Sequence, residues 1–135
     1  MPMDIQGRRP TATDGRQIRL EFWAWRPIHA LIGELCPDLF VARALKGMTF
    51  GDGSGPIDQA TCDTMAVRFE TWMAQHPEGA VLESGIRTAP DGRFVTEQEL
   101  AENPTMETVS PYAVDTELLK RWVAFLRHCG GFEVW

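Results

Sequence analysis

The sequence predicts an α+β fold in which three main helices pack on a small antiparallel sheet. Apolar and polar residues alternate over residues 17–25 and again over 132–135, which is typical of strands with one buried face. Three other segments, near residues 28–35, 58–76 and 115–129, repeat apolar residues at steps of three and four, which is typical of helices with one buried face. Because the chain contains both the two-residue period of strands and the three-to-four-residue period of helices, it favours a mixed α+β fold.

The chain has 135 residues, enough for one domain with its own core. Residues 1–16 are polar and rich in Pro, Gly and Arg, so we expect a flexible arm there and a single α+β domain over 17–135. The first residues contain no apolar signal-peptide region, and no apolar run has the length of a membrane span. The three scattered cysteines, Cys36, Cys62 and Cys129, fit a reducing compartment. We therefore expect a cytoplasmic protein with no membrane partner.

The first half of the domain reads as a strand followed by helices. Alternation over 17–25 directs Ile18 and Leu20 to the core and Trp23 and Trp25 outward. Arg26-Pro27 ends this strand and opens a helix, because proline suits a first helical turn. A short second helix follows Pro37, and Gly51 to Pro56 form a loop.

Capping residues mark the later helices. Asp58 is placed to cap the helix that runs to about His76, and Asp115 the helix that ends at Gly130-Gly131. The final strand, 132–135, is expected beside 17–25. Between these helices, Val81-Leu82 and Phe94-Val95 read as short strands around a Pro90-Asp91-Gly92 turn, and the Thr96 to Glu99 capping box predicts a short helix to Glu102.

Charge is distributed unevenly along the chain. The net charge is −6, but residues 50–117 alone carry thirteen carboxylates and three arginines, whereas both flanking segments are mildly basic. The predicted partner-binding carboxylates are Glu83, Asp91, Glu97, Glu99, Glu102 and Glu107. A negative surface attracts basic protein surfaces and repels phosphate backbones, so we expect a protein partner and no direct nucleic-acid binding. The alternative is that this acidic block only keeps the protein soluble.

Three tryptophans extend the predicted contact surface. Trp23 and Trp25 fall on the outward side of the predicted strand, and Trp135 is the last residue. Exposed together, they would form an aromatic patch of the kind that anchors protein interfaces. The alternative is that another segment covers them.

No motif predicts catalytic, metal-binding or cofactor-binding residues. The Gly-Asp-Gly-Ser-Gly stretch at 51–55 lacks the Lys-Ser/Thr of a phosphate-binding loop, and His29, His76 and His128 are too scattered to indicate a metal site. We therefore expect no enzyme and no cofactor. One alternative stays open, a ligand pocket or active site lined by Trp25, Arg26, His29 and Cys129, in which the thiol and imidazole could form a nucleophilic pair.

Two segments carry a resemblance to a known family. Phe22-Trp-Ala-Trp-Arg-Pro27 and Phe125-Leu-Arg-His-Cys-Gly-Gly-Phe132, together with the 51–55 loop, resemble the ends of a family of uncharacterised small bacterial and phage proteins. The resemblance covers about residues 17–76 and 114–135. Many members carry a zinc-knuckle-like Cys-x-x-Cys insert, which this chain lacks, so zinc is not implied. The resemblance implies a shared fold and a phage-like setting, not a reaction.

The leading functional hypothesis is a non-enzymatic, acidic protein-binding module. In its narrower form, it is a phage-type inhibitor that docks on a host nucleic-acid-handling defence complex, as anti-CRISPR proteins do. The alternatives are the small-ligand-binding protein or enzyme described above, and a dimerisation protein that uses the Trp-rich strand edge. The sequence leaves open whether the protein is a monomer or a homodimer.

Overall fold

The protein has an α+β fold. The computed structural model describes residues 2–77, 80–81, 87–91, 93–108 and 113–135. Four longer helices, α1 (Phe22–Leu35), α2 (Ala42–Phe50), α3 (Gln59–Gln75) and α5 (Thr116–His128), accompany a sheet of β1 (Pro2–Gly7), β2 (Gln17–Glu21) and β7 (Phe132–Val134). The short elements are η1 (Thr13–Gly15), β3 (Ala80–Val81), β4 (Arg87–Thr88), β5 (Phe94–Val95), α4 (Glu97–Glu102) and β6 (Ala113–Val114). Among the described residues, no helix is long and apolar enough to cross a membrane.

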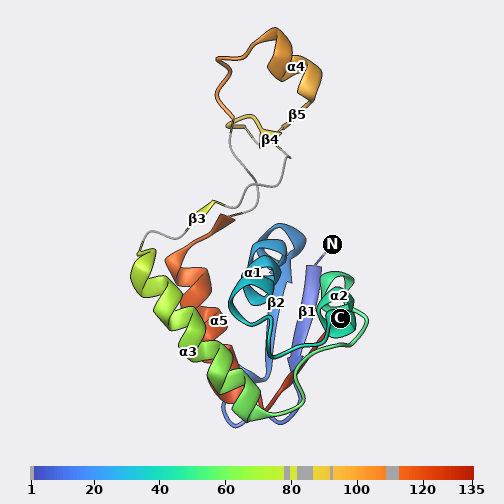
Figure 1. The fold of residues 1–135 in the computed structure, drawn as a ribbon, viewed down its shortest axis with the longest axis vertical. Helices are drawn as coiled ribbons and strands as arrows, with labels where there is room; N and C mark the ends of the chain where they lie inside the picture. Colours follow the sequence, from blue (N-terminus) through green and yellow to red (C-terminus); the bar gives the residue numbers. More distant parts are fainter. Residues whose placement is uncertain (1, 78–79, 82–86, 92, 109–112) are drawn as a thin grey trace.

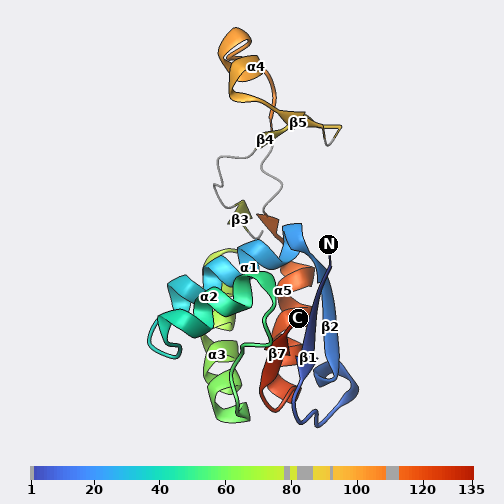
Figure 2. The same ribbon diagram turned by 90° about the vertical axis from the view of Figure 1, so that its right-hand side faces the viewer.

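The sheet forms one layer of the body and the longer helices form the other (Figures 1 and 2). Its strand order is β2-β1-β7, and both pairings are antiparallel. Alternate residues of each strand are buried toward the helices: Met3, Ile5, Ile18, Leu20, Phe132 and Val134. The intervening residues form a polar, open face, as expected when only one face of an antiparallel sheet is covered.

The predicted flexible arm is wrong over its first residues, because β1 is the central strand of the sheet. Met3 and Ile5 are 3% and 0% exposed, and β1 has a strand on each side. The residues of β1 alternate apolar and polar, so the strand has the same signal as β2 in a shorter form. As a consequence, β7 lies beside β1 and not, as predicted, beside residues 17–25.

The predicted strand over residues 17–25 ends four residues early. β2 stops at Glu21, and α1 begins at Phe22 with Pro27 inside the helix. The three-and-four spacing that buries Ile28 and Ile32 extends back to Trp25, and all three side chains are fully buried. The free energy gained by burying the Trp25 ring in the helical conformation outweighs the free-energy cost of placing Pro27 in the first turns of the helix.

The loop over residues 51–56 lies along the outer edge of β7 and bonds to it through the backbone. Phe132 N donates to Pro56 O at 2.9 Å and Val134 N to Ser54 O at 3.1 Å, so the loop covers the free edge of β7. At Gly55, a Cβ atom would lie 2.1 Å from Phe132 O, so only glycine allows this approach. The glycines therefore serve backbone pairing, in agreement with the absence of a phosphate-loop motif.

Between α3 and α5, the described residues from 80 to 113 form a projection from the body, whereas Val114 is buried in the core (Figures 1 and 2). β3 and β6 pair as a two-stranded stem, with Val81 opposite Ala113. Beyond the stem, β4 pairs with β5, and α4 follows. The predicted strand Phe94-Val95 is thus present, but it pairs with Arg87-Thr88, whereas Leu82 lies outside the described residues.

Candidate protein-binding site

The outer part of the projection, residues 87–108, is the candidate site, and we call it the acidic projection. Its hairpin is closed locally: Ala89 N donates to Arg93 O at 2.8 Å, and Arg93 N donates to the Asp91 carboxylate at 3.0 Å. This side-chain-to-backbone bond is the usual role of aspartate in a tight turn. It leaves Asp91 exposed at the turn.

The predicted capping box forms the short acidic helix α4. Thr96 Oγ1 accepts from Glu99 N at 3.1 Å, and Thr96 itself has the extended backbone of an N-cap. Glu97 and Glu99 lie in the first turn, where negative charge interacts favourably with the helix dipole. Glu97 and Glu102 are exposed and Glu99 is half-buried. The local sequence therefore suffices to present carboxylates on this element.

Most of these carboxylates have no counter-charge among the side chains that the structure describes. Arg93 Nη1 lies 3.0 Å from Glu99 Oε2, and this contact raises the pKa of the guanidinium. Asp91, Glu97, Glu102 and Glu107 form no ion pair with any residue that the structure describes. Residues 87–108 contain five carboxylates and two arginines, so this part of the molecule is net negative. Glu83, the sixth predicted carboxylate, lies outside the described residues.

An aromatic contact connects the acidic projection to the body. The rings of Trp23, on α1, and Phe94, on β5, lie 5.7 Å apart between centroids, tilted by 47°. Both remain accessible, with 39% and 56% of their surface exposed. The sequence analysis identified Trp23 but missed Phe94, although an aromatic residue beside a hairpin turn in an acidic segment was a usable signal.

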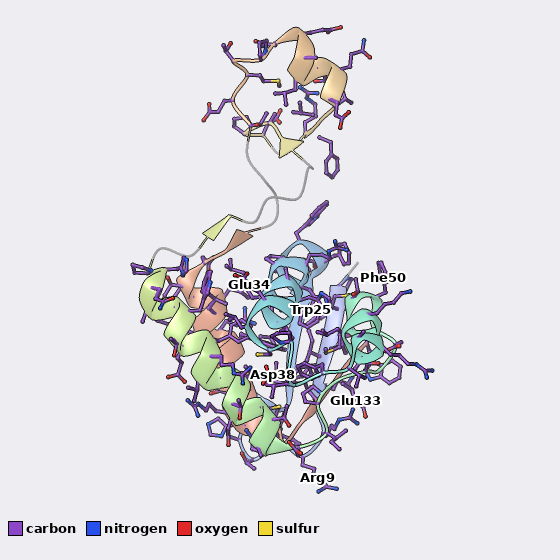
Figure 3. The ribbon with its side chains drawn as sticks, viewed as in Figure 1. Arg9, Trp25, Glu34, Asp38, Phe50 and Glu133 are labelled. Atoms are coloured by element: carbon purple, nitrogen blue, oxygen red, sulfur yellow. The ribbon has the colours of Figure 1, made fainter. Side chains whose placement is uncertain are left out.

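The predicted patch of three tryptophans is wrong for Trp25. Its side chain is fully buried, its Nε1 donates to Met48 O at 2.9 Å, and its ring packs against Trp122 at 5.8 Å (Figure 3). The reason is that residue 25 lies in a helix, on the side that contacts α2 and α5, and not on the outer face of a strand. Trp135 is half-exposed at the end of β7 and donates to Glu133 at 2.9 Å.

The alternative pocket of Trp25, Arg26, His29 and Cys129 does not form as an open site. His29 Nε2 lies 2.6 Å from Leu45 O, and Cys129 is fully buried with its sulfur 3.5 Å from that of Cys62. The hydrogen bond with the Cys62 thiol lowers the pKa of Cys129, but the Cys129 sulfur is fully buried in the core and is not exposed to a substrate. The polar atoms of Trp25 and His29 contact backbone carbonyls, so these residues serve packing.

The described residues offer little to a metal ion or a small ligand. They contain no group of three or more His, Cys, Asp or Glu side chains placed to hold a metal. A cavity of about 220 Å³ between α1 and α3 is lined by Leu35, Arg68, Thr71, Trp72 and Gln75, and its guanidinium is already paired with Asp38. Two other cavities flank β2 and α5.

No family model matches the chain, and no curated protein or solved structure matches it. The fold and the surface together define an α+β domain that carries a separate acidic projection. Any assignment of function therefore depends on the chemistry of that surface.

Proposed function

We propose that the protein is a non-enzymatic protein-binding module, and that the acidic projection is its contact surface. The observation that carries this proposal is a set of exposed carboxylates that form no ion pair among the described residues, on an element that extends away from the body (Figure 1). The acidic projection contributes little to the core, because none of its described residues belongs to the main hydrophobic cluster. Its sequence is therefore free to serve a purpose other than stability.

The proposed partner is a protein surface rich in lysine and arginine. Complementary charge speeds the encounter of two proteins and excludes partners of the same sign. A negative surface of this kind resembles a phosphate backbone in sign, so a nucleic-acid-binding groove would be a suitable target. The narrower hypothesis, a phage-type inhibitor of a host defence complex, rests on the family resemblance of the two end segments.

Trp23 and Phe94 add an apolar anchor to this site. Interface energy is usually concentrated in a few aromatic or arginine side chains surrounded by polar ones. An arginine or lysine of the partner could lie on one of these rings while its charge faces the carboxylates, which combines a cation–π contact with an ion pair. The proposed surface thus supplies both a central contact and a charged rim.

Charge reversal in α4 tests the proposal. We expect Glu97→Lys/Glu102→Lys to abolish capture of the partner from a lysate of the native host, measured by quantitative mass spectrometry against the wild-type bait. The matched control is Asp14→Lys/Glu34→Lys, which changes the net charge equally at exposed positions of the body. The control should capture the same proteins as the wild type.

Two results would count against the proposal. Equal capture by the α4 variant and the wild type would exclude the acidic projection as the contact surface. Equal loss with the control variant would show that total charge, and not its location, governs binding. Both variants should retain the wild-type circular dichroism spectrum, because the four substituted residues are exposed.

A further inference from the structure

One edge of the main sheet is open. β2 is an outer strand of the β2-β1-β7 sheet and forms its right-hand margin in Figure 2. Gly7 N donates to Arg16 O, so with the observed register the backbone groups of residues 16, 18 and 20 face β1. Those of Gln17 and Arg19 face away from it, and no described residue pairs with them. Such an edge is a template for another strand.

A groove runs beside this edge. Two adjoining cavities, of about 380 Å³ and about 400 Å³, lie between β2 and α5 and share Glu117 and Arg121. Its lining combines nearly buried apolar side chains, such as Ile18, Leu20 and Phe125, with charged ones, such as Arg19 and Lys120. An added strand would therefore find room beside β2, which is the arrangement used when strands bind between a sheet edge and a helix.

The edge is complementary to a second copy of itself. Glu21 is the N-cap of α1, so its carbonyl serves the helix and only Gln17 and Arg19 offer both backbone groups. Two copies can pair antiparallel in two registers. One register places Arg19 opposite Arg19 and is disfavoured by charge repulsion, whereas the other places Gln17 of each copy opposite Arg19 of its partner. In the second register, Gln17 donates to Asp4 at 3.3 Å and Arg19 Nε lies 3.5 Å from the same carboxylate, so each copy offers the Gln17 side-chain oxygen and the Arg19 Nη groups to the other.

We infer that the protein forms a twofold-symmetric homodimer in which β2 pairs antiparallel with β2 of a second copy, with Gln17 of each copy opposite Arg19 of the other. The two sheets join into one of six strands with four new backbone hydrogen bonds. The interface is isologous, as in most homodimers. This surface is separate from the acidic projection, so the dimer carries two projections and could bind a partner bivalently.

Sedimentation equilibrium tests the assembly directly. The chain mass is 15.2 kDa. We expect the apparent mass of the wild type to rise with protein concentration and to reach twice this value. Arg19→Pro removes an N–H that faces away from β1, so we expect the dimer dissociation constant to rise about tenfold or more. Arg19→Ala, the matched control, keeps the N–H and should weaken the dimer less.

Cysteine cross-linking tests the register without relying on the proline variant. An equal mixture of Gln17→Cys and Arg19→Cys chains should form a disulfide-linked heterodimer under mild oxidation, because paired Cα atoms in such a ladder are about 5.5 Å apart. Neither variant alone should cross-link. Cross-linking of Arg19→Cys with itself, or a wild type that stays monomeric up to about 1 mM, would overturn the inference.

Discussion

Two tryptophans, two positions apart in α1, have opposite roles. Trp25 is fully buried and bonded to Met48 O, whereas Trp23 is 39% exposed and contacts Phe94. Their separation by two helical residues places them on different sides of α1. Trp25 therefore contributes to the core and Trp23 to the candidate site.

Substituting each tryptophan by phenylalanine should separate these roles. We expect Trp25→Phe to lower the free energy of unfolding by about 2 to 4 kcal/mol, because it leaves Met48 O without its donor and opens a cavity. Trp23→Phe should change it by less than about 1 kcal/mol. Urea denaturation measures both, and similar losses for the two variants would contradict the assigned positions.

At the scale of elements, side-chain caps fix the beginnings of α3, α4 and α5, whereas α1 and α2 have no such cap. Asp58 accepts from Thr61 N at 2.8 Å at the start of α3, and Asp115 accepts from Leu118 N at 2.7 Å at the start of α5. These two helices pack together along the body (Figure 1). Hydrogen bonding from Thr61 holds the pKa of Asp58 below its usual value.

The cap of α3 makes stability depend on pH in a defined direction. A carboxyl whose folded pKa is lowered stabilises the fold above its unfolded pKa of about 3.9, and this contribution is lost as the pH falls through the lower folded value. Asp58→Asn keeps a capping acceptor and does not titrate. We expect the difference in melting temperature between the wild type and this variant to be constant above about pH 5 and to shift in favour of the variant below about pH 4. A difference that does not change over this range would contradict a charged cap.

The elements that sequence could predict are those specified by nearby residues. The starts of α3, α4 and α5 follow from Asp58, Thr96 and Asp115, and the positive φ angles of Gly130 and Gly131 end α5 as expected. The acidic helix of the candidate site was predictable for the same reason.

Sheet order was not predictable, because it depends on residues distant in sequence. β1 takes the central position through pairing with both β2 and β7, and its own Met-Asp-Ile-Gln segment is too short to indicate this. The burial of Trp25 depends on Met48 and Trp122, and the contact of Trp23 with Phe94 spans the projection stem. The local alternation over residues 17–25 therefore predicted a strand throughout, whereas tertiary packing places residues 22–25 in a helix.

At the scale of the whole molecule, stability and binding are assigned to different parts. The hydrophobic cluster draws on the sheet and on α1, α2, α3 and α5, and on none of the described residues between 74 and 113. The stem pairs Val81 with Ala113, so these residues lie directly opposite each other. The body can thus be closed by a short turn at the stem.

Replacement of residues 82–112 by Asn-Gly should leave a folded body. This dipeptide favours the two-residue turn that joins adjacent antiparallel strands. We expect a single cooperative thermal transition, close in temperature to that of the full chain, measured by circular dichroism. A variant without cooperative unfolding would show that the projection is required for the fold.

The same shortened chain gives the most direct test of the acidic projection as the binding surface. Both chains are used as baits in a lysate of the native host under identical salt conditions. The shortened chain should remain folded but should not capture the partner that the full chain captures. Full retention of that partner by the shortened chain would contradict the account and assign binding to the body.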